Sequence, residues 1–156
     1  MREFLFDQLK IIRNNTINAV KELSQNQAVE VPEGFNNSIL WNLGHIYLVQ
    51  ERFAFGFAQD PMELPDGFTD LFAGGTKPSD WKVQPPTLSE LIQLLEDQTS
   101  RISEKLNNRL AEAISNPLTL SSGLTLKTIG EFLTFSMYHE GMHVQTIKML
   151  KKFSAQ

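Results

Sequence analysis

Apolar residues recur every three or four positions along four long stretches of the chain, separated by segments rich in proline, glycine and polar residues. This spacing places the apolar side chains of a stretch on one face of an α-helix, where they can pack against neighbouring helices. The second stretch is apolar on nearly every side, which favours burial between its neighbours. The pattern predicts helices over residues 3–24, 37–57, 87 to about 110–114, and 125–153.

Hydroxyl and amide side chains at the starts of these stretches predict where the helices begin. Asn37 or Ser38 can accept a hydrogen bond from the free N–H groups at the start of the second helix. Thr87 and Thr128 are each followed three residues later by glutamate, which is the capping-box pattern. The last helix therefore begins at Thr128 or, alternatively, at Thr125.

The longest stretch without helical spacing covers residues 58–86. Its density of proline and glycine excludes a long helix, yet Phe68, Phe72 and Trp81 are too apolar for a solvated linker. Such a loop is either a lid over a binding site or a crossover that its aromatic side chains pin to the helices. Residues 115–124 form a turn-rich connection with at most a short extended piece.

These elements predict an all-α fold, because no stretch shows a strong strand pattern. Residues 25–36, which contain Pro32 and Gly34, are expected to be a loop. The long segment between the second and third helices can cross from one end of a bundle to the other, which favours a four-helix bundle in up-down-down-up order. The length of 156 residues suits one domain over residues 1–156.

Composition narrows the partners and the compartment. The chain is 41% hydrophobic and 21% charged, as in ordinary soluble proteins, and its net charge of −4 excludes the basic surface that binds nucleic acid. No apolar run is long enough to span a membrane, and the start of the chain does not resemble a signal peptide. Without cysteine there are no disulfides or thiolate ligands, so we expect a cytoplasmic protein.

The candidate chemistry lies in three histidines. His139 and His143 are one turn apart on the same face of the last predicted helix, a spacing that allows two imidazoles to share a metal ion. His45 lies in the apolar second helix, and a bundle would bring it toward the other two. Burying three imidazoles costs free energy unless each has a partner. One divalent ion can satisfy all three; the alternative is three separate core histidines.

Three nitrogen ligands suit zinc, nickel or iron and leave a position for water or substrate. Glu140, between the two histidines, is a candidate general base or a residue that orients a ligand. Arg52 follows His45 by two turns and either anchors an anionic substrate or pairs with an acid at the surface. Thr16 interrupts the apolar stripe of the first helix; it either bonds back to the preceding turn or lines an internal pocket.

The stretch from His139 to His143 also matches the His-Glu-x-x-His helix motif of zinc proteases, in which the glutamate is the general base. Those enzymes take their third ligand from a downstream position. Only 13 residues follow His143, and none of them is His, Asp or Glu. We therefore reject the protease interpretation.

Several segments resemble the DinB-like superfamily. Residues 37–45 (NSILWNLGH) are similar to the ligand segment on its second helix, and residues 128–133 (TIGEFL) with 138–145 (YHEGMHVQ) are similar to its fourth-helix signature. Residues 75–78 (GTKP) resemble members more loosely. Fourth-helix signatures often have glycine where this chain has Val144, a departure that leaves the histidines intact.

The resemblance implies a four-helix bundle with a long crossover and one divalent metal ion on His45, His139 and His143. The superfamily includes metal-dependent transferases that act with low-molecular-weight thiols such as bacillithiol or mycothiol. It also includes many members without a known activity, and members often form homodimers. For this chain it therefore implies a small-molecule substrate, a thiol co-substrate and a homodimer.

Three hypotheses follow for the function. In the first, a thiol or water on the metal attacks an electrophilic substrate, which makes the protein a thiol S-transferase or a hydrolase. In the second, the metal is structural, and a helix face or the long loop binds another protein. In the third, there is no metal and the histidines belong to the core. We prefer the first.

Overall fold

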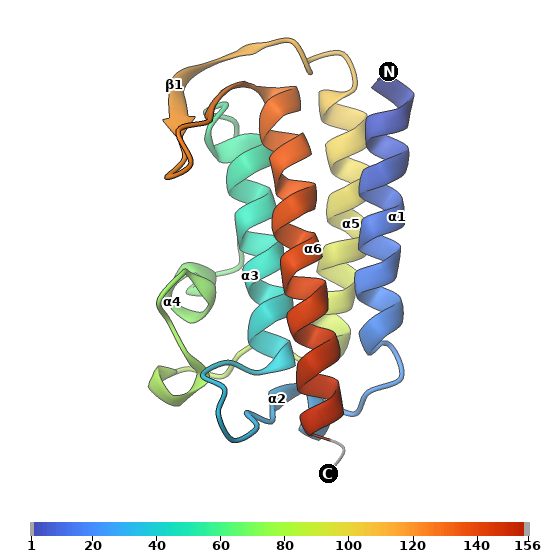
Figure 1. The fold of residues 1–156 in the computed structure, drawn as a ribbon, viewed down its shortest axis with the longest axis vertical. Coiled ribbons are helices and arrows are strands. Elements are labelled where there is room, and N and C mark those ends of the chain that lie inside the picture. Colours follow the sequence, from blue (N-terminus) through green and yellow to red (C-terminus); the bar gives the residue numbers. More distant parts are fainter. Residues whose placement is uncertain (1, 155–156) are drawn as a thin grey trace.

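The computed structural model describes residues 2–154, with the side chains of residues 4–154. Four long helices lie side by side along the longest axis of the molecule (Figure 1), which confirms the predicted mostly helical fold. Among the described residues, no helix combines the length and the apolar character needed to cross a bilayer. The long helices are α1 (Arg2–Val20), α3 (Ile39–Glu51), α5 (Leu88–Leu106) and α6 (Ile129–Phe153).

The predicted helix starts agree with the structure. The Ser38 hydroxyl accepts a hydrogen bond from the Trp41 N–H at 3.1 Å, at the start of α3. Thr87 and Thr128 each form a capping box with the glutamate three residues later, so α6 begins after Thr128 and not after Thr125. In both boxes the hydroxyl accepts from the glutamate N–H, at 3.2 Å for Thr87 and 3.3 Å for Thr128. Local side-chain chemistry therefore sets these boundaries.

Short helical segments lie within the regions that were expected to be loops. Residues 25–36 are not all loop, because a capping box between Ser24 and Gln27 starts α2 (Gln25–Val29). α3 continues into a π-helical turn, η1 (Arg52–Gly56), in which the Phe57 N–H donates to the Arg52 carbonyl at 2.9 Å. The crossover that follows contains α4 (Phe68–Phe72) and the 3₁₀ turn η2 (Pro78–Asp80).

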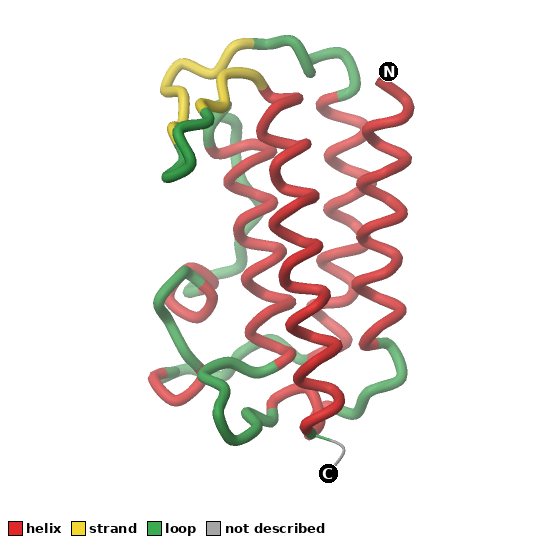
Figure 2. The backbone as a smooth tube through the Cα atoms, in the orientation of Figure 1, coloured by secondary structure: helices red, strands yellow, loops and turns green. Residues whose placement is uncertain are grey.

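The prediction of an exclusively helical chain is wrong at one point. α5 ends at Leu106, and the chain then forms β1 (Ala113–Thr119) and β2 (Thr125–Thr128), an antiparallel pair beside the first turn of α6 (Figure 2). Gly123, at a φ of +87°, lies in the turn between the strands. The apolar side chains of Ile114 and Leu126 are buried against the bundle. The hairpin therefore closes one end of the hydrophobic core.

The crossover is pinned to α3 by its apolar side chains. Phe68, Leu71 and Phe72 are buried, and α4 packs against α3 on the flank of the bundle (Figure 1). The Trp81 indole N–H donates to the Leu71 carbonyl at 2.9 Å. Gly44 of α3 permits the closest approach, because a Cβ there would lie 2.4–2.5 Å from three atoms of the Phe72 ring. This contact places the end of α4 beside the middle of α3.

We expect Gly44→Ala to destabilise the fold by about 1–3 kcal/mol, because the added methyl group must displace the Phe72 ring. Gly141→Ala is the matched control, since Gly141 is exposed in α6 and nothing lies within 4 Å of the place that a Cβ would take there. That change should stabilise the protein by about 0.5–1 kcal/mol through helix propensity. Urea unfolding of both variants measures the difference; equal effects would contradict the packing argument.

Candidate metal centre

The structure brings the three histidines together on the facing sides of α3 and α6. His45 comes from α3, and His139 and His143 come from successive turns of α6. One ring nitrogen from each lies within 4.8 Å of the other two, and the ring centroids are 4.6–5.2 Å apart. All three side chains are half-buried. The cluster therefore has donor atoms converging on one point and a side that solvent or a ligand can reach.

The crossover and α3 fix the orientation of His45. Its Nδ1 lies 2.7 Å from the carbonyl oxygen of Phe72, so Nδ1–H donates and Nε2 carries the free lone pair. The Trp41 ring stacks on the imidazole, with centroids 4.7 Å apart and planes 11° from parallel. The Trp41 indole N–H donates to the Thr76 hydroxyl at 2.9 Å, which ties the stacked pair to the crossover. His45 therefore depends on the crossover for its orientation.

His143 is oriented by an amide from α3. Its Nδ1 lies 2.8 Å from the Asn42 Oδ1, and the Asn42 amide N–H donates to the Ser38 carbonyl at 2.8 Å. The second bond fixes which end of the amide faces the ring, so Nδ1–H donates and Nε2 is left for a ligand. His139 has no hydrogen-bond partner among the described residues. Two of the three histidines thus have a defined tautomer that leaves Nε2 as the donor atom.

The surroundings keep the imidazoles neutral. Burial lowers the pKa of His139 to about 4, assisted by the nearby His45. Burial, together with the two neighbouring histidines, lowers the pKa of His143 to about 3. Burial also lowers the pKa of His45, opposed by its bond to Phe72 and assisted by the positive charge of Arg52. At neutral pH all three are in the form that binds a metal ion.

Glu140 points away from the histidines, toward α1. Its carboxylate accepts from the Arg13 guanidinium at 2.9 and 3.1 Å and from the Thr16 hydroxyl at 2.6 Å, and the residue is 2% exposed. Both oxygens are occupied, which is not the arrangement of a free general base. The Thr16 hydroxyl also lies 3.2 Å from the Ile12 carbonyl, which confirms the expected bond back to the preceding turn. No sequence signal pointed to Arg13, which lies 127 positions from Glu140.

Arg52 lies next to the cluster, at the junction of α3 and η1. It is half-buried, and its charge is close enough to lower the pKa of His45. Among the described residues, it forms no ion pair or hydrogen bond through its guanidinium. The surface acid that the sequence allowed as its partner is therefore not found in the described part of the chain.

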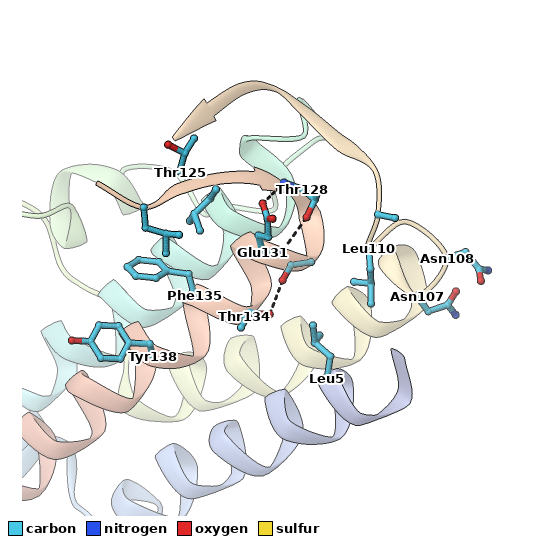
Figure 3. Close-up of a pocket in the computed structure, with 14 residues that line it drawn as sticks. Leu5, Asn107, Asn108, Leu110, Thr125, Thr128, Glu131, Thr134, Phe135 and Tyr138 are labelled. Carbon is cyan, nitrogen blue, oxygen red and sulfur yellow. Dashed lines mark hydrogen bonds between the residues drawn. The ribbon is translucent and has the colours of Figure 1, made fainter. Parts of the chain in front are cut away.

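A separate apolar pocket of about 720 Å³ lies near the hairpin. Phe135 and Tyr138 of α6 line one side of it, and Leu5 of α1 and Leu110 line the other (Figure 3). None of the three histidines lines this pocket. The pocket and the histidine cluster are therefore distinct features of the molecule.

Comparisons with known proteins agree with this architecture. A family model described as the DinB superfamily matches residues 8–147. The crystal structure of a conserved protein from Enterococcus faecalis matches with a TM-score of 0.69, and the match covers 99% of this chain and 97% of the other. The two chains are 12% identical, a likeness that shows a common fold. No curated protein matches this sequence significantly.

The lowered histidine pKa values predict a pH-dependent stability of the metal-free protein. Free histidine titrates near about 6.5, so between that pH and about 4 the unfolded chain binds more protons than the folded chain. Stability should therefore fall as the pH falls from about 6.5 toward 4. Urea unfolding at pH 7.0, 6.0 and 5.0 tests this, and the His139→Gln, His143→Gln double variant should lose less. An equal slope for both proteins would contradict it.

The buried pair of Arg13 and Glu140 predicts a strongly coupled double-mutant cycle. Arg13→Met leaves a buried carboxylate without its cation and should cost about 3–5 kcal/mol of stability. Adding Glu140→Leu removes that carboxylate, so the double variant should recover much of the loss. Urea unfolding of the two single variants and the double variant measures the coupling. Additive losses would show that the two side chains do not stabilise each other.

Proposed function

The chain belongs to the DinB superfamily, and on that basis we propose that it binds one divalent metal ion through His45, His139 and His143 and uses it in an enzymatic reaction. The observation that carries the proposal is the convergence of three neutral imidazoles within 4.8 Å. Zinc, nickel and iron all accept such nitrogen ligands.

The donor set fits a metal ion in its chemistry. The hydrogen bonds of His45 and His143 leave Nε2 free, which is the arrangement typical of metal-binding histidines. Two nitrogens in a tetrahedral zinc site lie roughly 3.4 Å apart, given bonds of about 2.0–2.1 Å. The separations of up to 4.8 Å are somewhat wider, so we expect the rings to move closer when an ion binds.

A metal ion on three neutral ligands lowers the pKa of a bound thiol or water and so supplies a nucleophile. The reaction is then thiol S-transfer with a low-molecular-weight thiol, or hydrolysis with water. In either case His45 and His143 hold their positions through Phe72 and Asn42. Trp41 covers one face of His45 and excludes water from that side. Glu140 takes no part in the proposed reaction, because Arg13 and Thr16 already bind its carboxylate.

The alternative is a structural metal in a module that binds another protein. The apolar pocket near the hairpin is the observation that favours it. A structural site normally takes four protein ligands. Within the described residues, no fourth His, Cys, Asp or Glu joins the cluster, so the open site of an enzyme has the stronger support.

We also propose the finer architecture that the sequence suggested. An up-down-down-up order over a single domain is supported by the antiparallel contacts of α3 with α6, where Asn42 meets His143 and His45 meets His139. A homodimer is supported by the exposed apolar side chains of Phe4 on α1 and Tyr138 on α6, which are 65% and 62% exposed.

Removal of one ligand tests the metal site. Loss of a residue that merely orients a metal ligand typically weakens metal binding about 10–100-fold. Loss of a ligand itself should cost more, so we expect His45→Ala to weaken metal binding by more than about 100-fold. Elemental analysis and Co²⁺ titration of protein without a His tag provide the measurement. Gln145→Ala, on the exposed side of α6, is the control and should bind as the wild type does.

Two results would contradict the proposal. An unchanged metal content in His45→Ala would exclude His45 as a ligand. A wild type with far less than one equivalent, even after reloading with several divalent ions, would leave only core histidines. If the metal binds, the melting temperature of the loaded protein is measured with and without low-molecular-weight thiols. A rise in melting temperature with a thiol would indicate an open, reactive centre, and no change would indicate a structural one.

A further inference from the structure

One arginine differs from the others in its partners. Four arginines have described side chains, and three of them pair with carboxylates, as expected for guanidinium groups that are wholly or partly buried. Arg52 has no such partner among the described residues, although it is half-buried. The three ion-paired arginines are Arg13 with Glu140, Arg101 with Glu51 and Glu63, and Arg109 with Asp60 and Glu112.

Arg52 lies close in sequence to one of the candidate metal ligands. Arg52 follows His45 by seven residues, directly after the end of α3, which is two helical turns on the same side and about 10 Å along the axis. It begins the π-helical turn η1, a departure from α-helical geometry that is common at functional sites. Its positive charge acts on His45, which places the guanidinium near the histidine cluster, while the nearest buried acid, Glu140, is paired with Arg13.

An apolar surface adjoins the arginine. Phe53 follows Arg52 in η1, and its ring centroid lies 5.9 Å from that of Phe135, which precedes His139 by one turn on α6. Both rings are half-buried. A ligand that extends from the histidines toward Arg52 would thus meet aromatic side chains along part of its length.

The charges at this place favour an anionic ligand. A metal ion on three neutral imidazoles keeps its full positive charge, and Arg52 adds another beside it. Two cations at a half-buried site repel each other unless an anion lies close to both. The described part of the chain supplies none, since none of its carboxylates pairs with Arg52. A ligand with an anionic group would offset both positive charges.

We propose that Arg52 binds an anionic group of the substrate at the histidine site, so the substrate class is a small molecule that carries a donor for the metal and a carboxylate or phosphate group separated by a short apolar linker. This inference rests on the proposed metal-binding function. It assigns Arg52 a part in specificity: an uncharged analogue would reach the metal but leave the guanidinium without a partner.

The test uses Co²⁺-loaded protein and two matched series of thiol probes. One series is the mercaptocarboxylates from mercaptoacetate to 6-mercaptohexanoate, and the other is the corresponding amides. The change in Co²⁺ absorption on thiol binding gives each dissociation constant. We expect the wild type to prefer the best carboxylate over its amide by about 10- to 100-fold, the range of a charge-assisted hydrogen bond.

Variants assign the preference to one side chain. Arg52→Gln should bind carboxylates and amides equally while its affinity for the amides stays unchanged. Arg52→Lys should keep part of the preference, because it keeps the charge but loses the fork of donors. Lys10→Gln removes the same charge from an exposed position on α1 and should behave as the wild type.

The outcomes separate this inference from the proposed function. If the wild type binds carboxylate and amide thiols equally, or if Arg52→Gln keeps the preference, Arg52 does not bind the anion although the metal site stands. If Lys10→Gln loses the preference as well, the general field of the protein and not Arg52 is responsible. If the wild type takes up no Co²⁺, the metal site and the inference are both overturned.

Discussion

The ion pair between Arg13 and Glu140 is the interaction on which the rest of the bundle depends. A carboxylate that is 2% exposed requires a cation and hydrogen-bond donors, and here α1 supplies both through Arg13 and Thr16. Glu140 lies between His139 and His143 in sequence, so its contact with α1 sets the rotation of α6 about its own axis. With Glu140 turned toward α1, the two histidines turn toward α3. The acid that a motif search would make catalytic thus orients the helix that carries two of the candidate ligands.

A second constraint comes from the crossover. Gly44 lets the Phe72 ring pack directly on α3, and this contact brings the Phe72 carbonyl within 2.7 Å of His45. Trp41 and Thr76 join the same two segments next to that bond. The crossover therefore orients a candidate ligand, in addition to covering α3. Sequence could not show this, because the group that matters is a backbone carbonyl, which has no side-chain signature.

The sequence predicted what depends on neighbours along the chain. Caps at Ser38 and Thr128 act over three residues and could be read directly, and so could the helical spacing that places histidines on one face. The same kind of signal is present at Ser24, which Gln27 follows three residues later and where α2 begins. The hairpin was not predictable in this way, since β1 and β2 are stabilised by pairing with each other and by packing on the bundle. Arg13 and Glu140 lie 127 positions apart, and only the packed helices determine which acid meets which arginine.

The balance of charge at the histidine site links the proposed metal ion to the proposed anionic substrate. His45, His139 and His143 are neutral ligands, so a divalent ion would keep both of its charges. Many metal sites offset that charge with a carboxylate, but here the buried acid between the two α6 histidines is committed to Arg13. Arg52 adds a further positive charge, while the chain as a whole carries −4. If a divalent ion binds as we propose, an anionic group beside the histidines and an acid group on Arg52 would offset the same excess of positive charge. In this proposal, activation of the nucleophile and selection of an anionic substrate would have one electrostatic cause.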